Sequence, residues 1–213
     1  MEKVTLFVFF IILGYSFTTE SDETQEIVTS LNSQQVTNLQ LKDTLKPTFS
    51  PDSMLNGIVI SKGRSTVDYL GTTIHEKWER DSSYLPYIRI ESNDSKQLLT
   101  AYAHPGSSIN DISEFKIEYK KNSTPNIKLK VKDEIFKTES GISLGINLTD
   151  LKSIKGKSDT TFLNQKILVI KYWLEMGSDD SGILEKYNMP SYYSNYYFQK
   201  GMLIKFEFGF DYP

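Results

Sequence analysis

The chain of 213 residues contains no cysteine, so it can form no disulfide, no thiolate metal site and no cysteine nucleophile. It has only two histidines, His75 and His104. The pair His75-Glu76 is followed by Glu79 where a zinc-protease helix would carry its second histidine, and His104 precedes the turn sequence Pro105-Gly106. We therefore expect no metal site, and we expect both histidines on the surface or at caps.

An excess of positive charge is also absent. The chain has 24 Lys and Arg against 27 Asp and Glu, which gives a net charge of −3 and an isoelectric point near 5.5. Such a chain has no extended positive field to hold a polyanion, so we expect no nucleic-acid partner. The lysines between positions 116 and 132 alternate with apolar residues, which is typical of the solvated face of a sheet.

Long hydrophobic runs are missing too. The apolar run at positions 4–13 is too short to cross the roughly 30 Å of a bilayer core. It follows Lys3 and precedes Gly14 and Ser16, which is typical of a secretory signal peptide. We expect a signal peptide at residues 1–16, cleaved after Ser16 or Thr18, and a secreted or periplasmic mature chain without a transmembrane span. An uncleaved membrane anchor is the alternative.

No glycine-rich phosphate loop is present, because neither GxGxxG nor GxxxxGK[ST] occurs. The glycines of KTESGISLGINLTDLKSIKG, residues 137–156, therefore indicate chain reversals at a corner of the fold. Asn147 can cap a helix, Asp150 can return the bond, and the apolar positions 148, 151 and 154 have helical spacing. Gly156 stands where a left-handed C-cap is expected. The stretch predicts a two-turn helix docked on a sheet.

Aromatic residues are abundant at 13%, with 13 Tyr and 12 Phe, which favours strands. Alternation of apolar and polar residues predicts antiparallel strands at 84–91, 98–103, 115–119 and 127–131. Residues 166–175 carry apolar side chains on both faces and predict a central strand, and residues 196–210 predict a hairpin turning at Lys200-Gly201. The expected fold class is α+β, mainly antiparallel sheet with short helices packed on one face.

The chain is expected to divide into an arm and two modules. Residues 17–53 are rich in small polar side chains and predict a flexible or marginally helical arm. A first αβ module is expected at residues 54–135 and a second at residues 136–213. The segment 58–71 echoes the segment 142–156 in its order of apolar residues, glycine, polar cap, acidic residue and glycine. The echo leaves open whether the modules arose by duplication and share a sheet or pack side by side.

Two segments carry a resemblance to known families. FKTESGISLG at 136–145, leading to YYFQKGMLIKFEFGF at 196–210, resembles a group of secreted proteins of Bacteroidetes-type bacteria in which a T-x-x-G-I-x-x-G phrase recurs. The order of glycine, capped short helix and antiparallel strands is also similar to the BamE/SmpA and β-lactamase-inhibitor-protein-like families. The resemblance covers roughly residues 136–210, brings no catalytic residue, and implies a bacterial envelope protein. The chain departs from BamE in having no cysteine for lipid attachment.

The most unusual local composition is a cluster of five tyrosines: Tyr187, Tyr192, Tyr193, Tyr196 and Tyr197. If three or more of these rings are exposed, they form a contact platform for a protein or a sugar, because tyrosine offers large area at little entropic cost. If the rings point inward, they belong to the core. These five residues are the candidate contact surface.

The acidic loop around Asp179 and Asp180 does not have the spacing of an EF-hand, so we interpret it as a solvated turn. We assign no catalytic residue, no cofactor and no metal ligand. The expected function is that of an exported non-enzymatic protein which binds or scaffolds in the periplasm or cell envelope, with another envelope protein or a glycan as partner. The alternatives are a secreted hydrolase with an acidic-residue site and an outer-membrane assembly accessory.

Overall fold

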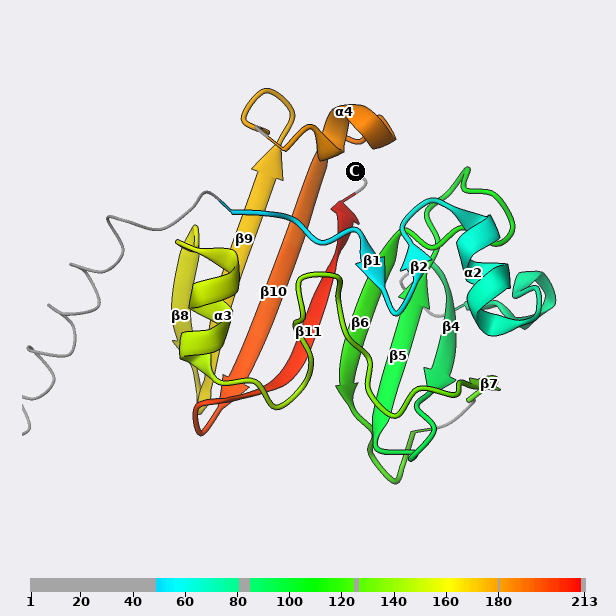
Figure 1. The fold of residues 1–213 in the computed structure, drawn as a ribbon, viewed down its shortest axis with the longest axis horizontal. Coiled ribbons are helices and arrows are strands. Elements are labelled where there is room, and N and C mark those ends of the chain that lie inside the picture. The colour runs from blue at the N-terminus through cyan, green and yellow to red at the C-terminus, as the bar shows by residue number, and fades with distance from the viewer. Residues whose placement is uncertain (1–48, 81–84, 125–126, 180, 212–213) are drawn as a thin grey trace, which may run out of the picture. The chain divides into compact units, whose positions relative to one another are not determined.

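A single large sheet organises the computed structural model, which describes residues 49–80, 85–124, 127–179 and 181–211. In spatial order, its antiparallel strands are β3 (Glu79–Arg80), β4 (Pro86–Glu91), β5 (Gln97–Tyr102), β6 (Glu114–Tyr119), β11 (Met202–Asp211), β10 (Ser191–Gln199), β9 (Ile167–Glu175) and β8 (Thr160–Asn164) (Figure 1). Strand β7 (Leu129–Lys130) pairs with β4 in parallel. The antiparallel strand predicted at 127–131 is therefore wrong in both length and direction.

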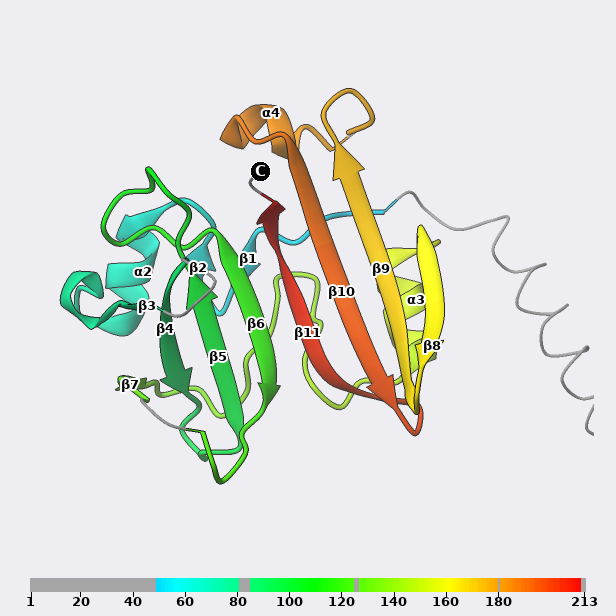
Figure 2. The ribbon, with the colours of Figure 1, turned by 180° about the vertical axis from the view of Figure 1, so that it is seen from behind.

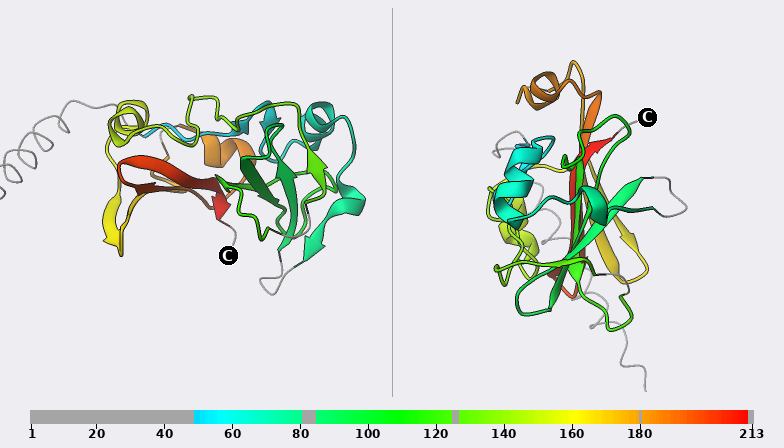
Figure 3. Two further views of the ribbon diagram at one scale, coloured as in Figure 1. Left: turned by 90° about the horizontal axis from the view of Figure 1, so that it is seen from below. Right: turned by 90° about the vertical axis from the view of Figure 1, so that its right-hand side faces the viewer.

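The helices lie on one face of this sheet. Helices α2 (Gly63–Leu70) and α3 (Leu148–Lys155) cover it together with a small hairpin of β1 (Met54–Leu55) and β2 (Ile58–Val59) (Figure 3). A 3-10 turn, η1 (His75–Lys77), follows α2, and α4 (Ile183–Tyr187) lies between β9 and β10 in the chain. The predicted α+β fold is confirmed.

The strand order is symmetric about its centre. In each half a helix precedes four strands, α2 before β3, β4, β5 and β6, and α3 before β8, β9, β10 and β11, and the halves meet where β6 pairs antiparallel with β11. A duplicated module sharing one sheet has this arrangement. Helix α4 and strand β7 have no counterparts in the opposite half of the described chain, and the duplication stays a prediction.

One core spans both halves. Buried residues of the hairpin, both halves of the sheet and α3 form a single cluster that includes Leu55, Ile90, Phe115, Leu151 and Tyr192. At the seam between β6 and β11, the rings of Phe115 and Phe208 are 5.1 Å apart. The two halves therefore share one continuous core.

The segment 137–156 forms the corner that its sequence predicts. The Asn147 Oδ1 atom accepts a hydrogen bond of 2.9 Å from the Asp150 amide, and α3 begins at the next residue. The amides of Gly141 and Gly145 donate to backbone carbonyls, so neither glycine forms an anion cradle. Gly156 has φ 75° and ψ −148°, a glycine conformation outside the left-handed helical region. The predicted left-handed cap is therefore wrong, because here the chain turns away from α3 towards β8.

The predicted arm ends inside the folded unit. The ring of Phe49 stacks on Tyr172 at 4.6 Å, and the Asp52 carboxylate is buried against Lys155. The prediction of a flexible arm is wrong for residues 49–53, because these residues cover the core between the sheet and α3. The predicted signal peptide at 1–16 and the rest of the arm lie outside the described residues. None of the helices described is long and apolar enough to cross a membrane.

Candidate functional site

The sheet face opposite α2 and α3 is the candidate functional site. Figure 2 shows this face, with α3 visible behind β9 and β8. No helix or second sheet of the described residues covers it (Figure 3). Since side chains alternate between faces along a strand, every second residue of each strand projects here. We call this the open face.

Aromatic side chains gather on the open face over β8, β9 and β10. Tyr193 on β10 is paired with Trp173 on β9. Four residues further along β10, Tyr197 is paired with Val169, and Val169 is paired with Phe162 on β8. Directly paired residues of neighbouring strands are close enough for their side chains to contact each other. We define the aromatic patch as Phe162, Trp173, Tyr193 and Tyr197.

The patch combines exposed rings with anchored ones. Phe162 and Trp173 are each 40% exposed, whereas Tyr193 and Tyr197 are half-buried. Val169, between Tyr197 and Phe162, is only 3% exposed. The apolar side chains on both faces of β9 therefore have two causes: one set fills the core, and the other supports the aromatic patch.

Two carboxylates fix the tyrosines of the patch. The Tyr193 hydroxyl donates to Glu114 and the Tyr197 hydroxyl donates to Glu207, both at 2.6 Å. Burial, and then the neighbouring carboxylates, raise the pKa of both phenols, so the tyrosines remain protonated donors. Glu207 itself has a lowered pKa: burial raises it, but the Lys205 ammonium and bonds from Tyr197 and Asn195 outweigh that effect.

Two lysines contact the rings of Phe162 and Tyr197, and a further carboxylate orients Trp173. The Lys171 ammonium lies 5.3 Å from the centre of the Phe162 ring, and the Lys205 ammonium lies 4.2 Å from that of Tyr197. The Trp173 indole donates to Glu175 at 3.0 Å. Cation–π contacts and hydrogen bonds of this kind reduce the freedom that a side chain would lose on binding.

The other half of the open face carries a second aromatic pair and several ion pairs. The rings of Tyr87 on β4 and Tyr102 on β5 are 6.1 Å apart. Lysines and carboxylates on or beside β3, β4, β6 and β11 form close pairs: Lys120 with Glu91 at 2.6 Å, Lys205 with Glu207 at 2.8 Å, Lys128 with Glu79 at 3.2 Å and Lys116 with Glu118 at 3.3 Å. Of the lysines between positions 116 and 132, Lys116, Lys120 and Lys128 thus lie on this face, each paired with a carboxylate. Because these charges are balanced locally, they leave no positive stripe for a polyanion.

His104 belongs to the support of the patch. Its Nε2 atom lies 2.6 Å from a Glu114 carboxylate oxygen, and the residue is 5% exposed. The expectation of a surface or cap histidine is wrong for His104, since this side chain is buried and contacts the carboxylate that accepts the Tyr193 hydroxyl. His75 is exposed in η1, as predicted.

The five tyrosines of the predicted contact surface do not form one surface. Tyr192 and Tyr196 are 0% and 1% exposed and lie on the helix-covered face, where the Tyr192 hydroxyl donates to the carbonyl of Asp52. Tyr187 is half-buried against Phe210, with ring centres 5.2 Å apart. Strand alternation separates Tyr192 and Tyr196 from their neighbours, so only Tyr193 and Tyr197 reach the open face.

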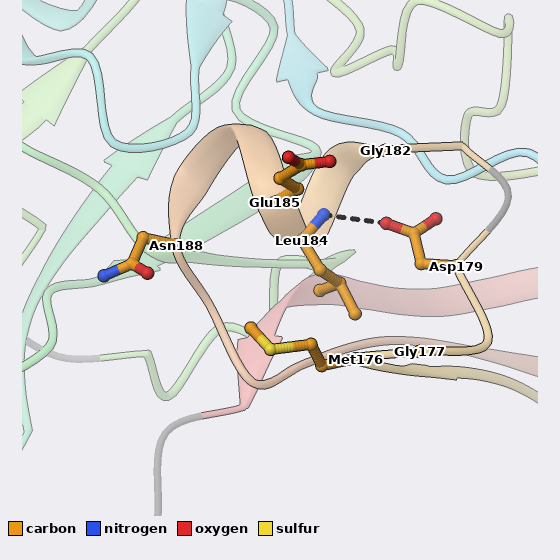
Figure 4. Close-up of a pocket in the computed structure, with 7 residues that line it drawn as sticks. All are labelled: Met176, Gly177, Asp179, Gly182, Leu184, Glu185 and Asn188. Atoms are coloured by element: carbon orange, nitrogen blue, oxygen red, sulfur yellow. Dashed lines mark hydrogen bonds between the residues drawn. The ribbon is translucent and has the colours of Figure 1, made fainter.

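The described residues of the acidic loop form a largely exposed turn, as predicted, and a hollow lies beside this turn and α4. A cavity of about 440 Å³ is lined by Met176, Gly177, Asp179, Gly182, Leu184, Glu185 and Asn188 (Figure 4). The Asp179 carboxylate accepts the amide of Leu184 at 2.8 Å and so serves as a cap of α4. Burial would raise the pKa of Asp179, but bonds from Ser181, Leu184 and Gly182 lower it overall. In the part of the chain that the structure describes, no three His, Cys, Asp or Glu residues are grouped to hold a metal ion.

Comparisons of this chain with models of protein families, with curated proteins and with solved structures gave no match in any of the three.

Proposed function

We propose that this chain is an exported binding module of the periplasm or cell envelope, and that its aromatic patch is the contact surface for a protein partner. The observation that carries the proposal is the position of four aromatic rings on one uncovered sheet face, two of them 40% exposed. Export rests on the N-terminal sequence, and the envelope role on the resemblance to envelope proteins.

The composition of the patch favours a protein partner. Trp and Tyr are enriched at the positions that contribute most to protein–protein binding. The rings of the patch are held by Glu114, Glu207, Lys171 and Lys205, so binding would order few additional side chains. Around the rings, paired charges supply the polar rim that such interfaces have.

The partner should present an apolar surface of its own with carboxylates at the margin. Lys171 is exposed between the two aromatic rows, where its ammonium can meet a negative group of the partner. A glycan could stack on the same rings, and a binding test separates the two cases, because a glycan ligand would survive protease treatment of the extract.

The test compares two double variants of the protein purified from its native host. Phe162→Ala with Trp173→Ala removes the exposed half of the patch, and Ile109→Ala with Ile135→Ala removes two exposed apolar side chains elsewhere, 59% and 51% exposed. A protein captured from envelope extract by the wild type is purified, and its affinity is measured by calorimetry. We expect a loss of about 30-fold or more for the patch variant and less than 3-fold for the control. Equal affinity of both variants would contradict the proposal.

A further inference from the structure

Strand β8 (Thr160–Asn164) is an unprotected sheet edge. It is the last strand of the order and pairs on one side only, with β9. All five of its residues are exposed, and Leu163, at 68%, is the most exposed large apolar residue in the described ranges. A strand edge presents a row of unpaired backbone donors and acceptors, so it is a template for a further strand.

The sequence of β8 lacks the devices that normally prevent edge pairing. TTFLN contains no charge, no proline and no glycine. The opposite edge of the sheet is different: β3 has two residues, one of them Arg80, and β7 places Lys130 beside β4. One edge is therefore short and charged, whereas the other is longer, uncharged and apolar.

We propose that β8 pairs with β8 of a second copy of this chain in an antiparallel two-fold dimer. A two-fold axis perpendicular to the sheet keeps the open faces of both copies on one side. With the axis at Phe162, this residue lies opposite Phe162 of the second copy. Thr160 then lies opposite Asn164 of the second copy, and Thr161 lies opposite Leu163. No charged residue opposes another within the paired strands, so self-pairing is free of repulsion.

The dimer places both aromatic patches on one continuous surface. Each Phe162 meets its counterpart at the axis, and Trp173 of each copy lies one strand further out on the same face. A single five-residue strand pair is smaller than a standard interface of about 800 Å² per partner, so we expect a weak dimer with a dissociation constant on the order of 100 µM. A partner with two sites would bind this dimer with increased avidity.

Disulfide trapping tests the register directly, because the full chain contains no cysteine of its own. The variant Phe162→Cys places two thiols face to face at the axis, within the range of a disulfide. Under mild oxidation we expect the disulfide-linked dimer of Phe162→Cys to form at least 10-fold faster than that of Thr149→Cys. Position 149 is exposed on α3 and serves as the control. An equal rate for the two variants would overturn the proposal.

Sedimentation velocity of the cysteine-free protein provides the second measurement. Between about 10 and 500 µM the wild type should shift from monomer towards dimer, whereas Phe162→Lys, which opposes two ammonium groups at the axis, should remain monomeric. A wild type that stays monomeric over this range overturns the dimer. The variant Trp173→Ala should dimerise normally, so the dimer and the proposed binding function fail or succeed independently.

Discussion

The ammonium of Lys155, in the last turn of α3, lies 2.7 Å from the Asp52 carboxylate, and both side chains are 1% exposed. Lys155 also donates to the carbonyl of Ser50 at 2.6 Å. Burial lowers the pKa of Lys155, and the Asp52 charge opposes that effect. This ion pair fastens the segment before β1 to α3, on the face of the sheet opposite the aromatic patch.

Loss of one member of this pair should strongly destabilise the fold. Lys155→Met leaves the Asp52 charge buried without its partner, which costs about 3–5 kcal/mol. Urea unfolding measures the difference, with Lys157→Met as the exposed control, expected to change stability by less than about 0.5 kcal/mol. The double variant Asp52→Asn with Lys155→Met should recover part of the loss. A cost below about 1 kcal/mol for Lys155→Met would show that the pair is not buried as described.

Gly209 should be intolerant of any side chain at the seam of the two halves. A Cβ atom there would lie 2.5 Å from the Ser113 carbonyl oxygen and 2.7 Å from Glu114 Cα, both backbone atoms. Gly209→Ala should therefore cost about 2–3 kcal/mol through forced movement of β6 against β11. The matched control is Gly177→Ala, at φ +95° with nothing within 4 Å of the added carbon, where only about 1 kcal/mol of backbone strain is expected. Equal costs in thermal unfolding would contradict the close approach.

The stability contribution of Glu207 should disappear in acid. Its folded pKa lies below the ordinary value of 4.5, so its stabilising effect is complete above pH 4.5 and is lost as pH falls through the folded pKa. Glu207→Gln should be about 1–2 kcal/mol less stable than the wild type at pH 7, and this gap should narrow below pH 4.5. Urea unfolding at pH 7 and pH 3 provides the measurement, with Glu185→Gln, an exposed carboxylate of α4, as control. A gap that does not change with pH would contradict an ionised, paired Glu207.

The cap of α3 should contribute a modest but measurable stability. Asn147→Ala removes the acceptor for the Asp150 amide and should cost about 1 kcal/mol. Thr149→Ala, at an exposed position in the first turn of α3, should leave the free energy of unfolding almost unchanged. A loss below about 0.3 kcal/mol for Asn147→Ala would mean that the cap does not stabilise the helix.

Local signals predicted the parts of the fold that depend on neighbouring residues. Alternation predicted β4, β5, β6 and the β10–β11 hairpin, a run that is apolar on both faces predicted β9, and the capping residues around Asn147 predicted α3. Strand β8 was missed, because its exposed, mixed sequence has no alternation. Contacts between distant residues were also beyond local patterns: nothing near Asp52 in the sequence indicates Lys155.

The candidate site was predicted in part. The tyrosine cluster contains Tyr193 and Tyr197, which reach the open face, but the sequence alone did not determine which side of β10 faces the core. A signal for Trp173 was present, since residues 166–175 have apolar side chains on both faces. That pattern was interpreted as a strand buried on two sides, whereas the structure has only one covered face. The role of His104 depends on Glu114 across a loop and has no sequence signature.

Photo-crosslinking in the native host tests the central claim most directly. A photoreactive phenylalanine analogue at position 173 would report what contacts the open face, and the same analogue at the exposed position 109 serves as control. We expect one discrete protein adduct at position 173 that is lost when Phe162→Ala and Tyr197→Ala are added, and no such adduct at position 109. The same adducts at both positions, or none at position 173, would contradict the assignment of the aromatic patch as the binding surface.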